Sequence, residues 1–168
     1  MKKITGINGF GRFGLHLIKY WLDRSSEANF RIDFINDDFL TIDDAYDMIT
    51  QDMSVVFNKY KVKKIGSIIR FIAADGKLHE IEYTNFSKDD IPWVGKPDYF
   101  LECSGKNTIK EDCQGFLTGN TKMVAISATS WDCDKVLVYG FNEEEYQSKD
   151  DKVISYGSCT VNAYIPIG

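Results

Sequence analysis

Near its amino terminus the chain reads Ile4-Thr5-Gly6-Ile7-Asn8-Gly9-Phe10-Gly11-Arg12-Phe13-Gly14. Residues 4–8 predict a buried strand, and the segment after the glycines carries an apolar face at helical spacing, formed by Phe13, Leu17, Ile18, Trp21 and Leu22. Gly9 permits a tight turn, Gly11 lets a pyrophosphate approach the backbone, and Gly14 lets the helix pack close to the strand. The free N–H groups of the first helical turn then face the phosphates. This strand, turn and helix therefore predict a site for a phosphate-bearing cofactor.

A second strand ends in an acidic residue that fits the same site. Residues 30–36 predict this strand, and Asp37 follows it at roughly the 20-residue separation from the glycines that such sites show. A carboxylate at this position accepts both hydroxyls of an adenosine ribose and repels a 2′-phosphate, so the pattern favours NAD over NADP. The alternative is that Asp37 and Asp38 lie in a solvated loop after the strand.

The composition indicates one domain, because 43% of the 168 residues are hydrophobic, enough for one core. No apolar run approaches the length of a membrane span, and the amino terminus enters the first strand without the apolar stretch of a signal peptide. We therefore expect a cytoplasmic protein without a membrane partner. The formal net charge of −5 argues against a nucleic-acid groove, so we expect no nucleic-acid partner.

The cysteines and histidines do not form a metal-binding pattern. The chain has no C-x-x-C spacing and only two histidines, so we expect no metal site. Because cytoplasmic α/β domains keep their thiols reduced, we expect at least two of the cysteines to be ordinary core or surface residues. We assign neither histidine to chemistry, placing one on the surface of the first helix and one on an exposed strand. The residues in question are Cys103, Cys113, Cys133, Cys159, His16 and His79.

The middle of the chain predicts a helix followed by an antiparallel excursion. Thr41 can cap a helix that runs to about residue 50. Residues 55–57 and 67–72 are β-prone, and Asp75-Gly76 between residues 67–72 and 78–83 is a strong hairpin signal. Trp93 is expected to anchor the return of the chain on the core.

The remaining segments return to parallel strand and helix order. We expect strands at residues 99–103, 123–126, 136–139 and 153–155, a helix capped by Asn107 or Thr108 and closed by Gly119, and a helical turn at residues 142–146. Small residues at Ser104-Gly105 and Ser127 end two of these strands. The predicted fold is α/β, a Rossmann-type doubly wound, mostly parallel sheet with an antiparallel hairpin excursion.

The last strand leads into a cysteine that is placed to be a nucleophile. Ser158-Cys159-Thr160-Val161-Asn162 is expected to open a helix. The helix dipole and the free N–H groups at a helix N-terminus favour the thiolate, which is the reactive form. A packed or incidental thiol is the alternative for any single cysteine.

At this point the sequence resembles the amino-terminal half of the glyceraldehyde-3-phosphate dehydrogenases, over essentially the whole chain. Six segments in the same order carry the resemblance: residues 8–14, residues 35–37, Glu102-Cys103-Ser104-Gly105, Ile126-Ser127-Ala128, residues 139–142 and Ser158-Cys159-Thr160 with Asn162.

The resemblance implies an NAD-dependent, two-step oxidation of a phosphorylated aldehyde. The thiolate of Cys159 adds to the aldehyde, the hemithioacetal gives hydride to NAD, and inorganic phosphate releases the acyl group. It further implies a phosphate site at Ser158 and Thr160 and a homotetrameric full-length protein of glycolysis. The cofactor-binding residues expected together from the motif and the resemblance are Asn8, Gly9, Gly11, Arg12, Phe13, Gly14, Asp37, Ser104, Gly105 and Ser127.

The chain also departs from the family pattern. The departures are Tyr156-Gly157 in place of Asn-Ala, Val161 in place of threonine, Asn107 in place of an aromatic residue, Thr129 in place of proline, and a different sequence around Asp52. The family's general-base histidine belongs to a second, catalytic domain, so we expect residues 1–168 to be a cofactor domain cut from a longer enzyme and inactive by itself. Two alternatives stay open: a dehydrogenase of erythrose 4-phosphate type, and a catalytically silent nucleotide-binding or interaction module.

Overall fold

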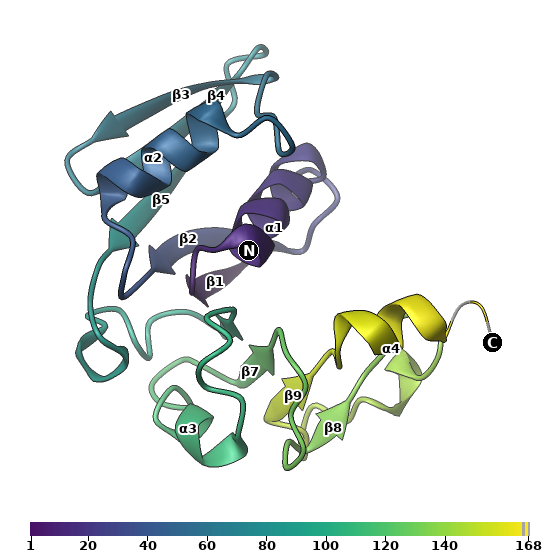
Figure 1. The fold of residues 1–168 in the computed structure, drawn as a ribbon. Helices are drawn as coiled ribbons and strands as arrows, with labels where there is room; N and C mark the ends of the chain where they lie inside the picture. Colours follow the sequence, from purple (N-terminus) through teal and green to yellow (C-terminus); the bar gives the residue numbers. More distant parts are fainter. Residues whose placement is uncertain (166, 168) are drawn as a thin grey trace.

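The computed structural model describes residues 1–165 and 167, which form one sheet with helices packed against it (Figure 1). In chain order the elements are β1 (Lys3–Asn8), α1 (Arg12–Asp23), β2 (Phe30–Asn36), α2 (Ile42–Gln51), β3 (Tyr60–Ile65), β4 (Ile68–Ala73), β5 (Leu78–Thr84), η1 (Lys88–Asp90), β6 (Tyr99–Glu102), α3 (Lys110–Gln114), β7 (Met123–Ile126), β8 (Lys135–Val136), η2 (Glu143–Glu145), β9 (Val153–Ser155) and α4 (Cys159–Tyr164).

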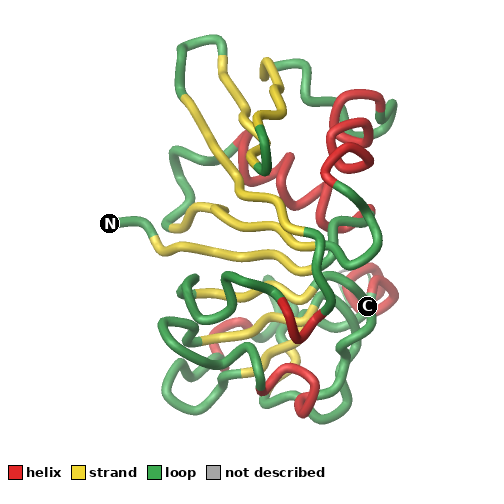
Figure 2. The backbone as a smooth tube through the Cα atoms, turned by 90° about the vertical axis from the view of Figure 1, so that its left-hand side faces the viewer, coloured by secondary structure: helices red, strands yellow, loops and turns green. Residues whose placement is uncertain are grey.

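The strands lie side by side in one sheet (Figure 2). The sheet is mostly parallel, and its strand order is β3-β4-β5-β2-β1-β6-β7-β9-β8. β1 pairs in parallel with β2 and β6, and β7, β9 and β8 continue the parallel order. β5 pairs in parallel with β2, whereas β4 is antiparallel to both β3 and β5. The predicted α/β architecture with an antiparallel excursion is therefore confirmed. The carboxyl ends of β2, β1, β6, β7 and β9 meet at one edge of the sheet.

The two faces of the sheet carry separate cores. α1 and α2 cover one face, where Ile18 and Ala45 pack with strand residues such as Ile35. On the other face, Trp93 and Phe116 pack with residues of β6, β7 and β9. The alternation along β6, where Phe100 belongs to the second core and Leu101 packs against the first, shows that the two cores lie on opposite sides of one sheet.

Several predicted elements agree closely with the structure. The strands predicted at residues 30–36, 123–126 and 153–155 have those bounds, and the Asp75-Gly76 hairpin joins β4 to β5. Thr41 caps α2 through a reciprocal capping box with Asp44. The predicted turn near residue 143 is η2.

The apolar face of α1 differs from the prediction by part of a turn. Its buried residues are Gly14, Leu15, Ile18, Trp21 and Leu22. Phe13, predicted on this face, is 41% exposed, and Leu15 is buried in its place. Phe13 lies outside the buried stripe of α1, and its ring stacks on Tyr156 instead.

Three segments were predicted wrongly. Residues 55–57 do not form a strand, and β3, which was not predicted, follows them instead. Its Tyr-Lys-Val-Lys-Lys-Ile pattern is that of an edge strand, where lysines deter pairing with a further strand. The strand expected at residues 136–139 shortens to β8, because the Asn142 side chain accepts the Val138 N–H at 2.8 Å and removes it from the ladder.

The helix expected after Asn107 is also shorter than predicted. α3 spans Lys110–Gln114, and its N-cap is Ile109 rather than Asn107 or Thr108. The Asn107 amide instead donates to Glu102 at 3.0 Å. No helix among the described residues is long and apolar enough to cross a membrane.

Trp93 is the largest fully buried side chain of the second core, as the sequence predicts for the anchor of the return loop. Its ring lies between Phe34 and Phe100, each at 5.4 Å between ring centroids. Its indole N–H donates to Thr84 Oγ1 at 2.9 Å. A Cβ on Gly6 would overlap the Trp93 ring, so Gly6 is the residue that lets the indole lie against β1.

Gly6→Ala should therefore lower the free energy of unfolding by about 1–3 kcal/mol, because the added methyl group overpacks the core. Urea unfolding followed by tryptophan fluorescence measures the change. Gly115→Ala is the matched control, since a Cβ there meets nothing within 4 Å and its backbone is already right-handed helical. Equal stability of the two variants would contradict the packing role of Gly6.

Candidate functional site

The three glycines of the turn between β1 and α1 differ in what a Cβ at each position would meet. Gly9 has φ +97°, and a Cβ there would overlap the backbone of Ser104. A Cβ on Gly14 would lie 2.7 Å from the Gly9 carbonyl oxygen. At Gly11, by contrast, φ is −76° and a Cβ would meet nothing within 4 Å. The fold therefore requires Gly9 and Gly14, while the packing of the described residues does not require Gly11.

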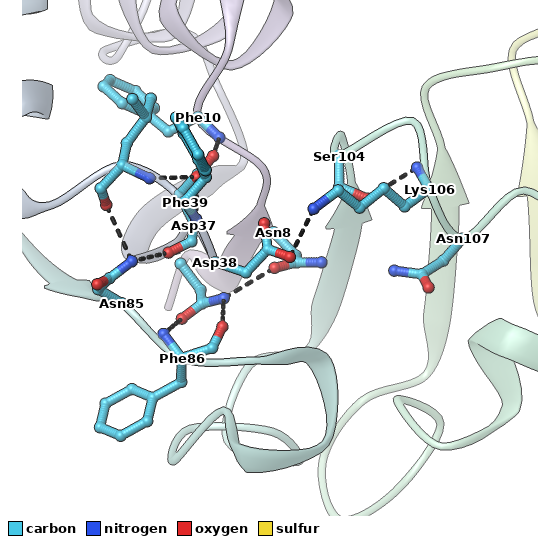
Figure 3. Close-up of polar contacts among 12 residues, drawn as sticks. Asn8, Phe10, Asp37, Asp38, Phe39, Asn85, Phe86, Ser104, Lys106 and Asn107 are labelled. Atoms are coloured by element: carbon cyan, nitrogen blue, oxygen red, sulfur yellow. Dashed lines mark hydrogen bonds and ion pairs between the residues drawn. The ribbon is translucent and has the colours of Figure 1, made fainter.

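Asp37 lies against this turn (Figure 3). It is buried at the end of β2, and its Oδ2 accepts the Phe10 N–H at 2.7 Å. Its Oδ1 accepts the N–H groups of Phe39 at 2.9 Å and Leu40 at 2.8 Å. Asp37 is thus a fixed part of the turn and not a residue of a solvated loop. Asp38 is exposed and pairs with Lys106 at 2.6 Å, which joins the segments after β2 and β6.

A buried chain of polar side chains, here called the polar ladder, crosses the carboxyl ends of four strands. It consists of Thr84 of β5, Asn36 of β2, Asn8 of β1 and Glu102 of β6. Thr84 Oγ1 donates to Asn36 Oδ1 at 2.9 Å, Asn36 Nδ2 donates to Asn8 Oδ1 at 2.9 Å, and Asn8 Nδ2 donates to Glu102 Oε2 at 2.8 Å. All four residues are buried.

Glu102 is the last residue of the polar ladder, and each oxygen of its carboxylate accepts two hydrogen bonds. Oε2 also accepts from Asn107 Nδ2 at 3.0 Å, and Oε1 accepts from the backbone N–H of Ser104 at 2.8 Å and from the Ser104 hydroxyl. The Ser104 hydroxyl, predicted to contact a cofactor, is therefore held by Glu102 in this structure. The backbone oxygen of Glu102 accepts the Ser127 N–H at 2.8 Å, which places Ser127 at the same edge.

Of the four residues of the polar ladder, the sequence prediction named only Asn8 as a site residue. Thr84, Asn36 and Glu102 share one signal that could have found them: each is a polar residue at the last position of its strand. Strand-end polar residues of neighbouring parallel strands meet at one edge, but the sequence does not say which strands are neighbours.

Arg12 and Phe13 begin α1 and point to different partners. Arg12 forms an ion pair with Asp52 at 2.5 Å. The N–H groups of Val55 and Ser54, together with Arg12, hold the pKa of the Asp52 carboxyl below its ordinary value. Phe13 stacks on Tyr156, with 5.3 Å between ring centroids and 17° between the ring planes. Tyr156 was noted in the sequence only as a departure from the family, not as a site residue.

Cys159 is the first residue of α4, where the sequence predicts that a helix opens, and its side chain is exposed. Ser158 is the N-cap, and its Oγ accepts the Val161 N–H at 3.0 Å. Thr160 is exposed beside it, and Asn162 Nδ2 ties the loop by donating to the carbonyl groups of Tyr156 and Ser158 at 2.8 and 2.9 Å.

The other three cysteines are also free thiols, and they are less exposed than Cys159. Burial raises the pKa of Cys103 to about 12 and that of Cys113 to about 12. Burial also raises the pKa of Cys133. Cys159 is therefore the thiol that the structure leaves accessible.

The two histidines lie on α1 and β5. His16 is exposed on α1 and stacks against Tyr20. His79, predicted to be exposed, is half-buried, with its ring edge-on to Trp21 and Nε2 3.4 Å from Ser25 Oγ. Burial, with Lys77 and Lys2 nearby, lowers its pKa. In the described residues no three His, Cys, Asp or Glu side chains lie close enough to hold a metal ion.

Curated relatives of this chain include glyceraldehyde-3-phosphate dehydrogenases. Glyceraldehyde-3-phosphate dehydrogenase 4 of Caenorhabditis elegans is 35% identical over 99% of this chain, which spans 48% of that protein. Glyceraldehyde-3-phosphate dehydrogenase 2 of Streptomyces avermitilis is 32% identical over 97% of the chain, and the enzyme of Lactobacillus delbrueckii subsp. bulgaricus is 30% identical over 96%. No protein-family model matches the chain. The chain spans about half the length of these relatives and is homologous to their amino-terminal domain, so the resemblance seen in the sequence is confirmed.

Glu102→Gln should destabilise the domain by about 1–3 kcal/mol, because an amide NH₂ replaces an acceptor where four donors converge and leaves buried donors unpaired. Glu111→Gln, at an exposed position of α3, is the control and should be neutral. Thermal unfolding of both variants measures the difference. An unchanged Tm for Glu102→Gln would show that the polar ladder contributes nothing to stability.

Cys159 should be alkylated first by iodoacetamide at neutral pH, because it is exposed and burial raises the pKa of the other three thiols. Mass-spectrometric mapping of the labelled cysteine over time checks this order. Earlier labelling of Cys103, Cys113 or Cys133 in the folded chain would contradict it.

Proposed function

We propose that this chain is the NAD-binding domain of a phosphorylating, glyceraldehyde-3-phosphate dehydrogenase-type oxidoreductase whose nucleophile is Cys159. The observation that carries the proposal is the open space at Gly11, at the start of α1, between Asp37 on one side and the Cys159 loop on the other. Homology to the amino-terminal domain of these dehydrogenases supports the same assignment.

The start of α1 fits a pyrophosphate. Its N-cap, Gly11, provides no side-chain cap, and its first turn contains no acidic residue. The first-turn N–H groups of a helix lack intrahelical partners and, with the dipole, favour an anion. Because a methyl group at Gly11 would point into open space, a glycine here is explained by a ligand that approaches the backbone.

Asp37 fits the adenosine ribose of NAD. Three backbone N–H groups hold its carboxylate, two on Oδ1 and one on Oδ2, so Oδ2 keeps a lone pair for a ribose hydroxyl. A 2′-phosphate would meet this carboxylate and would be repelled, whereas the charge of the neighbouring Asp38 is paired with Lys106. The geometry therefore supports a preference for NAD over NADP.

The chemistry assigned to the chain's own residues centres on Cys159. Bound NAD supplies the hydride acceptor. Cys159 is exposed at the start of α4, where its sulfur can add to the carbonyl carbon of a phosphorylated aldehyde. Ser158 keeps its O–H free to donate while its oxygen caps α4, and Thr160 is exposed beside it, so both can bind a phosphate oxygen. Inorganic phosphate as the acyl acceptor, a homotetrameric full-length protein, a second catalytic domain and a cytoplasmic location rest on the resemblance to the family alone.

Calorimetry of the chain with NAD and NADP tests the cofactor assignment. NAD should bind more tightly than NADP, because the carboxylate of Asp37 repels the additional phosphate. Equal affinities, or a preference for NADP, would remove the role proposed for Asp37.

Gly11→Ala tests the phosphate turn in the same assay. It should weaken NAD binding by about tenfold or more, equivalent to about 1.4 kcal/mol, because its methyl group occupies the space of the pyrophosphate. Its cost in stability should stay below about 1 kcal/mol, since alanine is only a poorer N-cap than glycine. Gly115→Ala should leave binding unchanged. Unaltered NAD affinity in Gly11→Ala would place the phosphates elsewhere.

A further inference from the structure

The Phe13–Tyr156 pair joins the phosphate turn to the cysteine loop. Phe13 stands in the first turn of α1, and Tyr156 stands between β9 and Cys159. Their rings stack with 5.3 Å between centroids and 17° between planes. The two residues come from opposite ends of the chain, so the stack is formed only when β1 and β9 occupy their places in one sheet.

The pair is part of an accessible surface. Phe13 is 41% exposed and lies outside the buried stripe of α1, and Tyr156 is half-buried. The Tyr156 backbone is fixed on both sides: its N–H donates to the Ile126 carbonyl at 3.3 Å and its carbonyl accepts from Asn162 Nδ2 at 2.8 Å. A stacked pair on a fixed backbone presents ring faces in a defined orientation.

The position of the pair fits one half of a dinucleotide. Asp37, proposed for the adenosine ribose, lies on the β2 side of the glycine turn, while Tyr156 and Cys159 follow β9 on the β6 side. A dinucleotide whose pyrophosphate lies at Gly11 and whose adenosine lies at Asp37 extends its second ring toward β9. Burial raises the pKa of Tyr156, and Cys103 and Cys159 add to the effect.

We infer that Tyr156, stacked on Phe13, is a specificity-determining residue that makes this domain bind the oxidised dinucleotide in preference to the reduced one. This inference rests on the proposed function. The ring of the oxidised nicotinamide carries a positive charge and that of the reduced form does not. The faces of phenylalanine and tyrosine rings are negative, so they attract the cation and give the neutral ring only stacking.

The test compares the affinities for NAD⁺ and NADH by calorimetry in four proteins: the unaltered chain, Tyr156→Phe, Tyr156→Leu and Tyr164→Leu. Tyr156→Leu should weaken NAD⁺ binding by about two- to fivefold, the fold-change of an exposed cation–π contact, and should change NADH binding by less than that. Tyr156→Phe keeps a ring face and should keep the preference. Tyr164→Leu, at an exposed position of α4, controls for loss of any aromatic residue near the carboxyl end and should behave as the unaltered chain.

The outcomes separate the inference from the proposed function. If the unaltered chain binds neither form, the proposed function fails. If it binds both and Tyr156→Leu lowers both affinities by the same factor, or changes neither, the specificity role of Tyr156 is overturned. Tighter binding of both forms by Tyr156→Leu would also overturn it, because the stack would then occupy the space of the ligand ring. Thermal unfolding of each variant confirms that the compared proteins are folded.

Discussion

The polar ladder of Thr84, Asn36, Asn8 and Glu102 is the constraint on which the arrangement of the site depends. Each side chain is buried, and each finds its partner on the neighbouring strand. A buried polar group without a partner costs about 1–3 kcal/mol, so the set is satisfied only when β5, β2, β1 and β6 end in register. The ladder therefore fixes where the carboxyl edge of the sheet lies, and with it the glycine turn that follows β1.

This constraint leaves a particular set of groups for a ligand. The side chains at the strand ends use their donors and acceptors on one another: Glu102 alone accepts four hydrogen bonds, two of them from Ser104. What faces outward at this edge is backbone N–H at the start of α1, the remaining lone pair of Asp37, and the thiol of Cys159. The polar ladder holds the strand ends rigid, and the groups that face outward are available to a ligand. This arrangement suits a site that binds a phosphate-bearing molecule without rearrangement of the protein.

The sequence predicted what is local and missed what depends on distant strands. The β1–α1 turn, the bounds of β2, the cap of α2 by Thr41 and the start of α4 at Cys159 follow from neighbouring residues, and the structure confirms them. β3 was missed because its lysines are typical of a strand only when that strand lies at the edge of a sheet, and the sequence does not show which strand is the edge. The polar ladder and the Phe13–Tyr156 stack were missed because each joins residues that are far apart in the sequence, and the order of strands in the sheet is not encoded in local spacing.

The three glycines of the turn show how structure refines a motif. Local spacing treats Gly9, Gly11 and Gly14 alike, but the folded chain explains only two of them: Gly9 by its positive φ and the approach of Ser104, and Gly14 by the carbonyl of Gly9. Gly11 has ordinary dihedral angles and open space in front of it. A glycine that neither backbone strain nor packing accounts for is best explained by a ligand that approaches the backbone. At the start of a helix, the free N–H groups and the helix dipole favour an anion as that ligand. Gly11 therefore supports the proposed phosphate site more directly than the complete motif does.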